Sequence, residues 1–100
     1  MKLILNSFDK NVKMLLESKS VFENKVRIVE ELGELSHEIL KDTRGKLNRE
    51  NLLEEFADVI IELHMLKEIY NISENEIDKA VNNKMEKDLN RLKNKEVQNG

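Results

Sequence analysis

Acidic residues recur in two similar segments of this chain, "EELGEL" at 30–35 and "EEFADV" at 54–59. Glu31 and Glu34 of the first segment correspond to Glu55 and Asp58 of the second. Carboxylate oxygens are the ligands that hard divalent cations prefer, Mg²⁺ first and Mn²⁺ as a substitute. Because the sequence contains no cysteine, thiolate ligands and cysteine nucleophiles are excluded. The repeated acids therefore suggest a magnesium site built from two segments.

The acids of the first segment fall on one face of a helix. Glu31, Glu34 and Glu38 are three and four residues apart, so their side chains stack on neighbouring turns. Roughly opposite lies an apolar stripe made of Phe22, Val29, Leu32 and Leu40. The ordinary explanation is a solvated acidic face, with Arg27 as the surface partner of Glu31. Taken alone, this segment favours exposed acids.

The acids of the second segment have apolar surroundings instead. Glu55, Asp58 and Glu62 project into a sector that also contains Val59, Met65, Leu66 and Ile69. The better candidates for the solvated edge of this helix are Glu54, His64 and Glu68. A helix that is apolar around most of its circumference should be largely buried, so carboxylates within its apolar sector need a partner.

Repulsion between these acids would be severe if the two helices brought them together. Like charges at i,i+4, such as Glu34 with Glu38 or Asp58 with Glu62, each cost roughly 0.2–0.5 kcal/mol even in solvent. Two unit charges about 4 Å apart repel by about 4 kcal/mol at an effective dielectric constant near 20. Some carboxylates must then bind protons, or a cation must lie among them. A divalent cation would neutralise several of them at once.

Helix-capping residues locate the elements that would position these acids. Ser20 with Glu23 and Ser73 with Glu76 have the spacing of N-terminal capping boxes. The segment "DTRGKLN" at 42–48 contains Gly45 and ends in Asn48, which is typical of a loop followed by a capping residue. We therefore predict helices at 7–17, 21–41, 49–70 and 74–92, with a short frayed tail from about residue 93.

The composition is that of a single all-α domain spanning residues 1–100. The chain is 39% hydrophobic and 37% charged, and it contains no proline and three glycines. Its net charge of −3 and its lack of a basic stripe argue against nucleic acid as a partner. No segment reads as a signal peptide or membrane span, so we expect a cytoplasmic protein without a membrane partner. The apolar third helix predicts at least a homodimer.

The pattern Glu31-x-x-Glu34 followed by Glu55-x-x-Asp58 resembles the MazG-like all-α nucleoside triphosphate pyrophosphohydrolases, which are related to the dimeric dUTPases. The resemblance covers roughly residues 22 to 92. It implies a four-helix chain that forms a helical bundle between subunits, as dimers often paired into tetramers. The larger members of the family have longer loops or a second domain that this chain lacks, so the resemblance does not indicate which base is preferred.

The resemblance also implies roles for individual residues. Glu31, Glu34, Glu55 and Asp58 would bind Mg²⁺, and Glu34 would also orient the attacking water in the catalytic step. The segment "AVNNKMEKDLNR" is similar to the family's phosphate-binding segment, so the substrate-binding residues would be Asn82, Lys84 and Arg91. A register shifted by one turn would use Asn83 and Lys87 instead. The ordinary alternative for this segment is a mixed-charge helix surface.

The expected activity is Mg²⁺-dependent cleavage of a (d)NTP between the α and β phosphates, which yields (d)NMP and pyrophosphate. Two alternatives stay open at the level of sequence. One is a phosphoribosyl-ATP pyrophosphatase, which has similar size, helices and acids. The other is a non-catalytic helical dimer that acts as an adaptor or regulatory module, with its acids as a solubilising surface.

Overall fold

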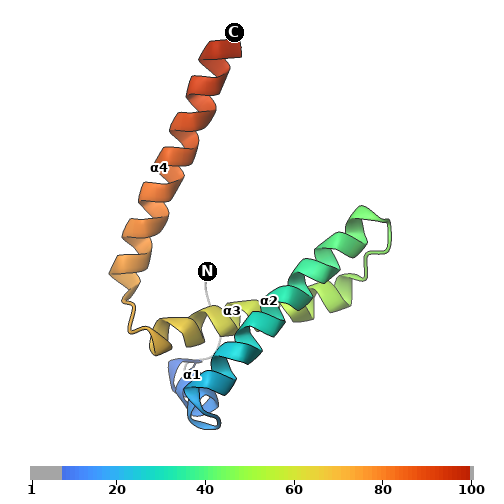
Figure 1. The fold of residues 1–100 in the computed structure, drawn as a ribbon, viewed down its shortest axis with the longest axis vertical. Coiled ribbons are helices and arrows are strands. Elements are labelled where there is room, and N and C mark those ends of the chain that lie inside the picture. Colours follow the sequence, from blue (N-terminus) through green and yellow to red (C-terminus); the bar gives the residue numbers. More distant parts are fainter. Residues whose placement is uncertain (1–7, 100) are drawn as a thin grey trace. The chain divides into compact units, whose positions relative to one another are not determined.

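A computed structural model describes residues 8–99, and within this range the chain forms helices and no strand (Figure 1). The helices are α1 (Phe8–Glu17), α2 (Val21–Thr43), α3 (Arg49–Ile69) and α4 (Glu74–Asn99). The predicted all-α class is confirmed. The start of the first helix was predicted at residue 7, which lies outside the described residues.

The caps predicted from the sequence are present. The backbone N–H groups of Glu23, Asn51 and Glu76 donate to the side chains of Ser20, Asn48 and Ser73, at 3.1, 3.1 and 3.2 Å. In the last of these the Ser73 N–H also donates to Glu76 Oε2 at 2.7 Å, which completes the reciprocal capping box. These local bonds explain why the starts of α2, α3 and α4 could be predicted.

The C-terminal ends of α2 and α4 differ, because a stop signal follows α2 and none is present at the predicted end of α4. After α2, Gly45 adopts φ 71°, and the N–H groups of Gly45 and Lys46 donate back to Asp42 and Lys41 in a Schellman motif. In contrast, α4 continues to Asn99, so the predicted helix end at 92 is wrong. Residues 93–99 contain neither proline nor glycine, and the lysines, Glu96 and Gln98 are good helix formers.

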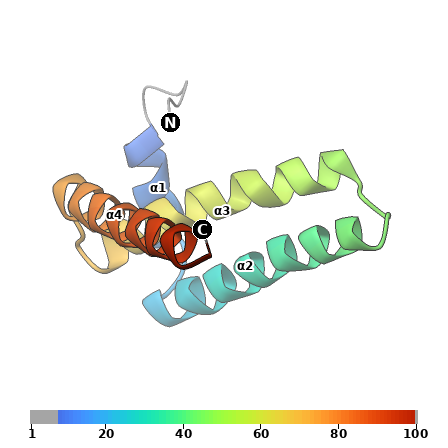
Figure 2. The same ribbon diagram turned by 90° about the horizontal axis from the view of Figure 1, so that it is seen from above.

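The chain divides into two compact units, residues 1–70 and 71–100. In the first unit α2 and α3 form an antiparallel hairpin, and α1 packs against α3 (Figure 2). The second unit consists of α4. Within the described residues, no helix combines the length and the apolar character that crossing a membrane would need.

The core of the first unit is small. Val12, Ile28 and Met65 are buried, and the partly buried hydrophobic side chains packed against them are Phe8, Leu16, Ile61, Leu66 and Ile69. His64, predicted at a solvated edge, packs edge-to-face on the ring of Phe8 with centroids 4.8 Å apart. Burial, and then the charge of Lys67, lower the pKa of His64. The prediction for His64 is therefore wrong.

The orientation of α2 also differs from the prediction. Its apolar stripe faces outward, with Phe22 76% and Val29 68% exposed. The less exposed side of α2 contains Asn24, Ile28, Glu31, Leu35 and Glu38, and the less exposed side of α3 contains Glu55, Asp58, Glu62, Met65 and Ile69. Both sets advance by steps of three and four residues, as the a and d positions of a heptad do. The hairpin is thus held along a seam that is partly acidic.

Candidate functional site

Three carboxylates from the two facing helices converge in the middle of the hairpin. Glu31 and Glu34 on α2 and Glu55 on α3 each place one oxygen so that all three oxygens lie within 4.8 Å of one another. Glu31 and Glu55 are partly buried, whereas Glu34 is exposed. We call this group the carboxylate trio. The structure therefore brings together three of the four residues predicted to bind a metal.

Asp58, the fourth predicted ligand, lies beside the trio and not within it. It is partly buried on α3, between Glu55 one turn before it and Glu62 one turn after it. Its negative charge contributes to raising the pKa of Glu31, Glu55 and Glu62. Asp58 therefore interacts electrostatically with the trio and with the next acid along α3.

Burial and mutual repulsion make the ionised forms of these acids unfavourable. The pKa of Glu31 is raised to about 7, first by burial and then by the charges of Glu34 and Asp58, while Arg27 acts in the opposite direction. The pKa of Glu55 is raised by burial first, and then by a hydrogen bond to Glu34 and the charge of the same residue. Because two ionised carboxylates have no proton to share, this contact favours a protonated or cation-bound trio.

Four acids of the hairpin each leave one oxygen without a donor. The Oε2 atoms of Glu31, Glu38, Glu55 and Glu62 are buried and have no hydrogen-bond partner. Buried polar atoms in proteins are nearly always paired, so several orphaned oxygens in one hairpin require an explanation. Each orphan is a carboxylate oxygen, which is the donor atom that Mg²⁺ and Mn²⁺ bind. The residues present therefore fit the divalent cation that the sequence motif implies.

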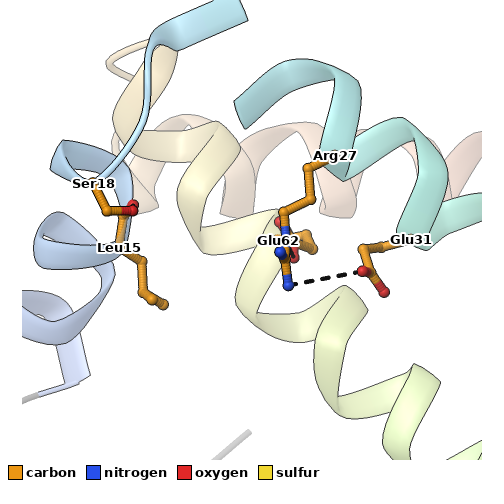
Figure 3. A network of polar contacts seen from close by, with 5 residues as sticks. All are labelled: Leu15, Ser18, Arg27, Glu31 and Glu62. Atoms are coloured by element: carbon orange, nitrogen blue, oxygen red, sulfur yellow. Dashed lines mark hydrogen bonds and ion pairs between the residues drawn. The ribbon is translucent and has the colours of Figure 1, made fainter. Parts of the chain in front are cut away.

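Basic side chains offset part of this negative charge. Arg27 lies 3.9 Å from Glu31 Oε1 through Nη2, and 3.9 Å from Glu62 Oε1 through Nε (Figure 3). Lys41 Nζ pairs with Glu38 Oε1 at 3.0 Å. The predicted contact of Arg27 with Glu31 is confirmed, but Glu31 is not on a solvated face, because its side chain is only 14% exposed. Arg27 also reaches across the hairpin to α3, which was not predicted.

A cavity of about 310 Å³ lies between α1 and the hairpin, and no residue of the trio lines it. Glu34 and Glu55 of the trio line a separate, open hollow on the hairpin instead. Of the acids of the hairpin, Asp58 and Glu62 belong to the lining of the cavity beside α1. Its wall also contains Arg27 of α2, Leu15 of α1 and Ser18, which follows α1. Figure 3 labels these three residues together with Glu62. Sequence reasoning missed this cavity. It depends on how α1 packs against the hairpin, which no local pattern encodes.

The predicted substrate-binding residues lie on α4, in the second unit. Asn82, Lys84 and Arg91 are all exposed. Lys84 Nζ lies 3.1 Å from Asp88 Oδ1, and Arg91 Nη1 lies 3.7 Å from the same oxygen. These one-turn ion pairs are typical of a mixed-charge helix surface, which was the ordinary alternative for this segment. Phosphate binding by these three residues stays a prediction from the sequence.

The hairpin offers a set of oxygen donors from two helices, with the exposed carboxylate of Glu34 in an open hollow that Glu55 also lines. Such a set can hold a hard cation and present it to a ligand with phosphate oxygens. Comparisons of the chain with protein-family models, with curated proteins and with solved structures found no match.

Proposed function

We propose that the protein is a Mg²⁺-dependent nucleoside triphosphate pyrophosphohydrolase, which cleaves a (d)NTP between the α and β phosphates. The observation that carries the proposal is the carboxylate trio, whose oxygens lie within 4.8 Å of one another and include buried atoms without partners. The resemblance of the Glu31, Glu34, Glu55 and Asp58 motif to the MazG-like enzymes supplies the reaction.

The roles follow from exposure and position. Glu31, Glu55 and Asp58 are partly buried on facing helices, so they are suited to hold Mg²⁺ in a fixed place together with Glu34. When bound, the cation neutralises the triphosphate and lowers the cost of charge at the α phosphorus. Glu34 is exposed, so it alone of the trio is open to solvent on its outer side. We assign it the catalytic role of orienting the attacking water and accepting its proton.

The reaction then balances with water as the only co-substrate. The water oxygen forms a bond to the α phosphorus, and the bond from that phosphorus to the bridging oxygen breaks. Pyrophosphate leaves with the bridging oxygen, and the proton of the water passes to Glu34. The trio supplies the negative charge that makes a hydrogen-bonded water more nucleophilic.

Assembly is the second part of the proposal. We propose that the active form is a homodimer, with the tetramer as a further step. Large apolar side chains are exposed on both helices of the hairpin, among them Phe22 at 76%, Val29 at 68% and Phe56 at 51%. Exposed apolar patches of this kind are typical of protein interfaces. Light scattering should give at least twice the mass of 11.8 kDa, and Val29→Glu should reduce it.

Activity is tested with a panel of NTPs and dNTPs in Mg²⁺, scored for pyrophosphate against orthophosphate. We expect pyrophosphate and a nucleoside monophosphate in equal amounts, and no product after chelation of the metal. Glu55→Gln removes one charge of the trio and should abolish turnover. The matched control is Glu54→Gln, which changes an exposed glutamate on the preceding residue and should keep full activity.

If the protein is a non-catalytic adaptor, the opposite response to Mg²⁺ is expected. Its acids would be a solubilising surface, so Mg²⁺ would neither stabilise the protein nor support release of pyrophosphate. The partly buried positions of Glu31 and Glu55 favour the proposal of an enzyme over that of an adaptor. Carboxylates that only increase solubility would stay exposed, because burial of a charge is unfavourable. Orthophosphate as the only product, or equal activity of Glu55→Gln, would refute the pyrophosphohydrolase.

A further inference from the structure

The helix α4 forms the second unit, and none of its side chains from 74 to 96 is buried. Within this range every side chain is exposed except that of Ile77, which is partly buried. Helices in proteins gain most of their stability from packing an apolar face against a partner. The weak helix formers in the interior of α4 add to this need, and they are Asn82, Asn83, Asn90 and Asn94. We therefore expect a partner to cover one face of α4.

One side of α4 carries an apolar stripe, which we call the α4 stripe. It consists of Ile77, Val81, Met85, Leu89 and Leu92, whose steps of three and four residues place them on one side of the helix. The last four of these side chains are 47–56% exposed. From its first to its last residue the stripe is about 22 Å long, given a rise of 1.5 Å per residue. A continuous exposed apolar surface of this kind is typical of an interaction site.

The charges of α4 are divided between its two ends. Residues 74–79 contain three acids and one lysine, whereas residues 84–96 contain five basic residues and three acids. Two parallel copies of α4 would therefore set acids beside acids and basic residues beside basic residues. Two antiparallel copies would set the acidic end of each helix beside the basic end of the other, which is favourable. The charge pattern thus favours a second copy of α4, in the antiparallel direction, as the partner.

We propose that α4 binds α4 of a second copy of this chain, antiparallel, through the α4 stripe. The twofold axis passes through Met85, so that each methionine meets its own copy. Val81 then lies opposite Leu89 of the second copy, and Ile77 lies beside Leu92 of the second copy. The same stripe is thus complementary to itself, as a twofold interface requires.

The same register pairs charges at both ends of the interface. Asp78 is on the side of the α4 stripe, because it is three residues before Val81 and seven before Met85. In the antiparallel pair Asp78 lies beside Lys93 of the second copy. The interface uses no residue of the hairpin or of the carboxylate trio, so it is independent of the proposed enzymatic activity.

Disulfide trapping in the full chain tests this register, because the chain contains no cysteine of its own. Met85→Cys places a thiol on the twofold axis and should give a disulfide-linked dimer under mild oxidation. Val81→Cys should be cross-linked about tenfold less, because its two copies would be about 12 Å apart along the helices and a disulfide needs Cα atoms within about 7 Å. Adding Leu89→Cys to Val81→Cys should restore the cross-link. Within one helix these two positions are also about 12 Å apart, so the link must join two copies.

The matched control is Asn83→Cys, which places a thiol on the opposite side of α4 and gives the background of chance collisions. Cross-linking of Met85→Cys and of the double variant at this background level would overturn the proposal, and the α4 stripe would then contact a hairpin or a different protein. Equal cross-linking of Met85→Cys and Val81→Cys would indicate a parallel pair and would also overturn it. Cross-linking is scored without substrate, so absence of pyrophosphate release would refute the proposed function and leave this result unchanged.

Discussion

Carboxylates occupy two contrasting settings in this protein, the seam of the α2–α3 hairpin and the surface of α4. On α4, Asp88 has a side chain that is 51% exposed and contacts Lys84 and Arg91 on neighbouring turns. In the hairpin, Glu31 and Glu62 are largely buried, and each has an oxygen without a donor. The residue types are similar, but on α4 the acid is exposed between two basic neighbours, whereas in the hairpin the basic partners offset only part of the charge and buried oxygens stay without a donor.

The difference follows from which residues occupy neighbouring turns. One turn from Asp88 the chain has basic residues, whereas one turn from Asp58 it has Glu54, Glu55 and Glu62. Along the same seam, Ile28 and Met65 are buried and hold the helices together. The apolar positions of the hairpin therefore form its small core, while its acidic positions include buried oxygens that no donor among the described residues satisfies.

The largest expected effect is on activity, and it comes from Asp58→Asn. The substitution removes a charge beside the trio without changing the size of the side chain. Because even residues behind metal ligands typically contribute 10- to 100-fold, we expect turnover with Mg²⁺ to fall by at least about 100-fold. The variant should stay folded, with a melting temperature equal to or above that of the wild type, since a like charge is removed.

Steady-state release of pyrophosphate and thermal melting measure the two effects. Asp88→Asn, the same change on α4, is the matched control and should retain activity to within about twofold. Full activity of Asp58→Asn would show that Asp58 is not part of the site, which would then consist of the trio alone.

The second effect is stabilisation by metal. A ligand present at a hundredfold excess over its Kd stabilises the folded state by about 2.7 kcal/mol, and each kcal/mol raises the Tm of a domain of this size by about 4–8 °C. We expect Mg²⁺ and Mn²⁺ to raise the Tm of the chelator-treated protein by about 10 °C or more at that excess. Glu55→Gln should lose most of the shift. An identical Tm with and without metal would argue that the acids bind no cation.

The third effect is a pH dependence of the metal-free protein. The pKa of Glu31 is about 7 in the folded state against 4.5 for the free side chain, so between these values the folded state holds a proton that the unfolded state has released. Stability therefore decreases as pH rises from about 4.5 to 7. Discounted for solvent screening, this contribution of Glu31 to the free energy of unfolding is on the order of 1 kcal/mol.

Urea denaturation at several pH values measures this slope, and Glu31→Gln should flatten it. Metal binding should show the opposite trend, because protons compete with the cation for the same oxygens. A wild-type protein whose stability rises across this window to the same extent as that of Glu31→Gln would show that Glu31 is already ionised at pH 5.

The sequence predicted those parts of the fold that depend on local bonds. Ser20, Asn48 and Ser73 cap helices as expected, because an N-cap involves residues only two or three positions apart. The end of α4 was misplaced because the tail was judged by its lack of apolar periodicity. A helix made of good helix formers needs a stop signal to end, and this one has none before Gly100.

The site was predictable in its residues and less so in its geometry. On α3 the acids are flanked by apolar residues, so their burial could be inferred. On α2 the more apolar stripe through Phe22 and Val29 was taken as the inner face, although the inner face mixes acids with Ile28 and Leu35. The spacing of three and four residues, which the acids of both helices share, could have indicated that the acidic face of α2 is the inner one. The contact of Arg27 with Glu62 depends on the register between the helices, which the pattern of one helix does not contain.

The smallest expected effect concerns stability on α4, where Asp88→Asn breaks the contacts with Lys84 and Arg91. Exposed ion pairs contribute about 0.2–1 kcal/mol and one-turn helix pairs about 0.3–0.5 kcal/mol, so the free energy of unfolding should change by less than about 1 kcal/mol. The change should vanish in 1 M salt, where the Debye length falls to about 3 Å. Denaturation followed by circular dichroism, at low and at high salt, measures this change in the free energy of unfolding. A larger, salt-resistant loss would mean that Asp88 is held by something other than its neighbours on the helix, and the contrast between the two settings would then no longer hold.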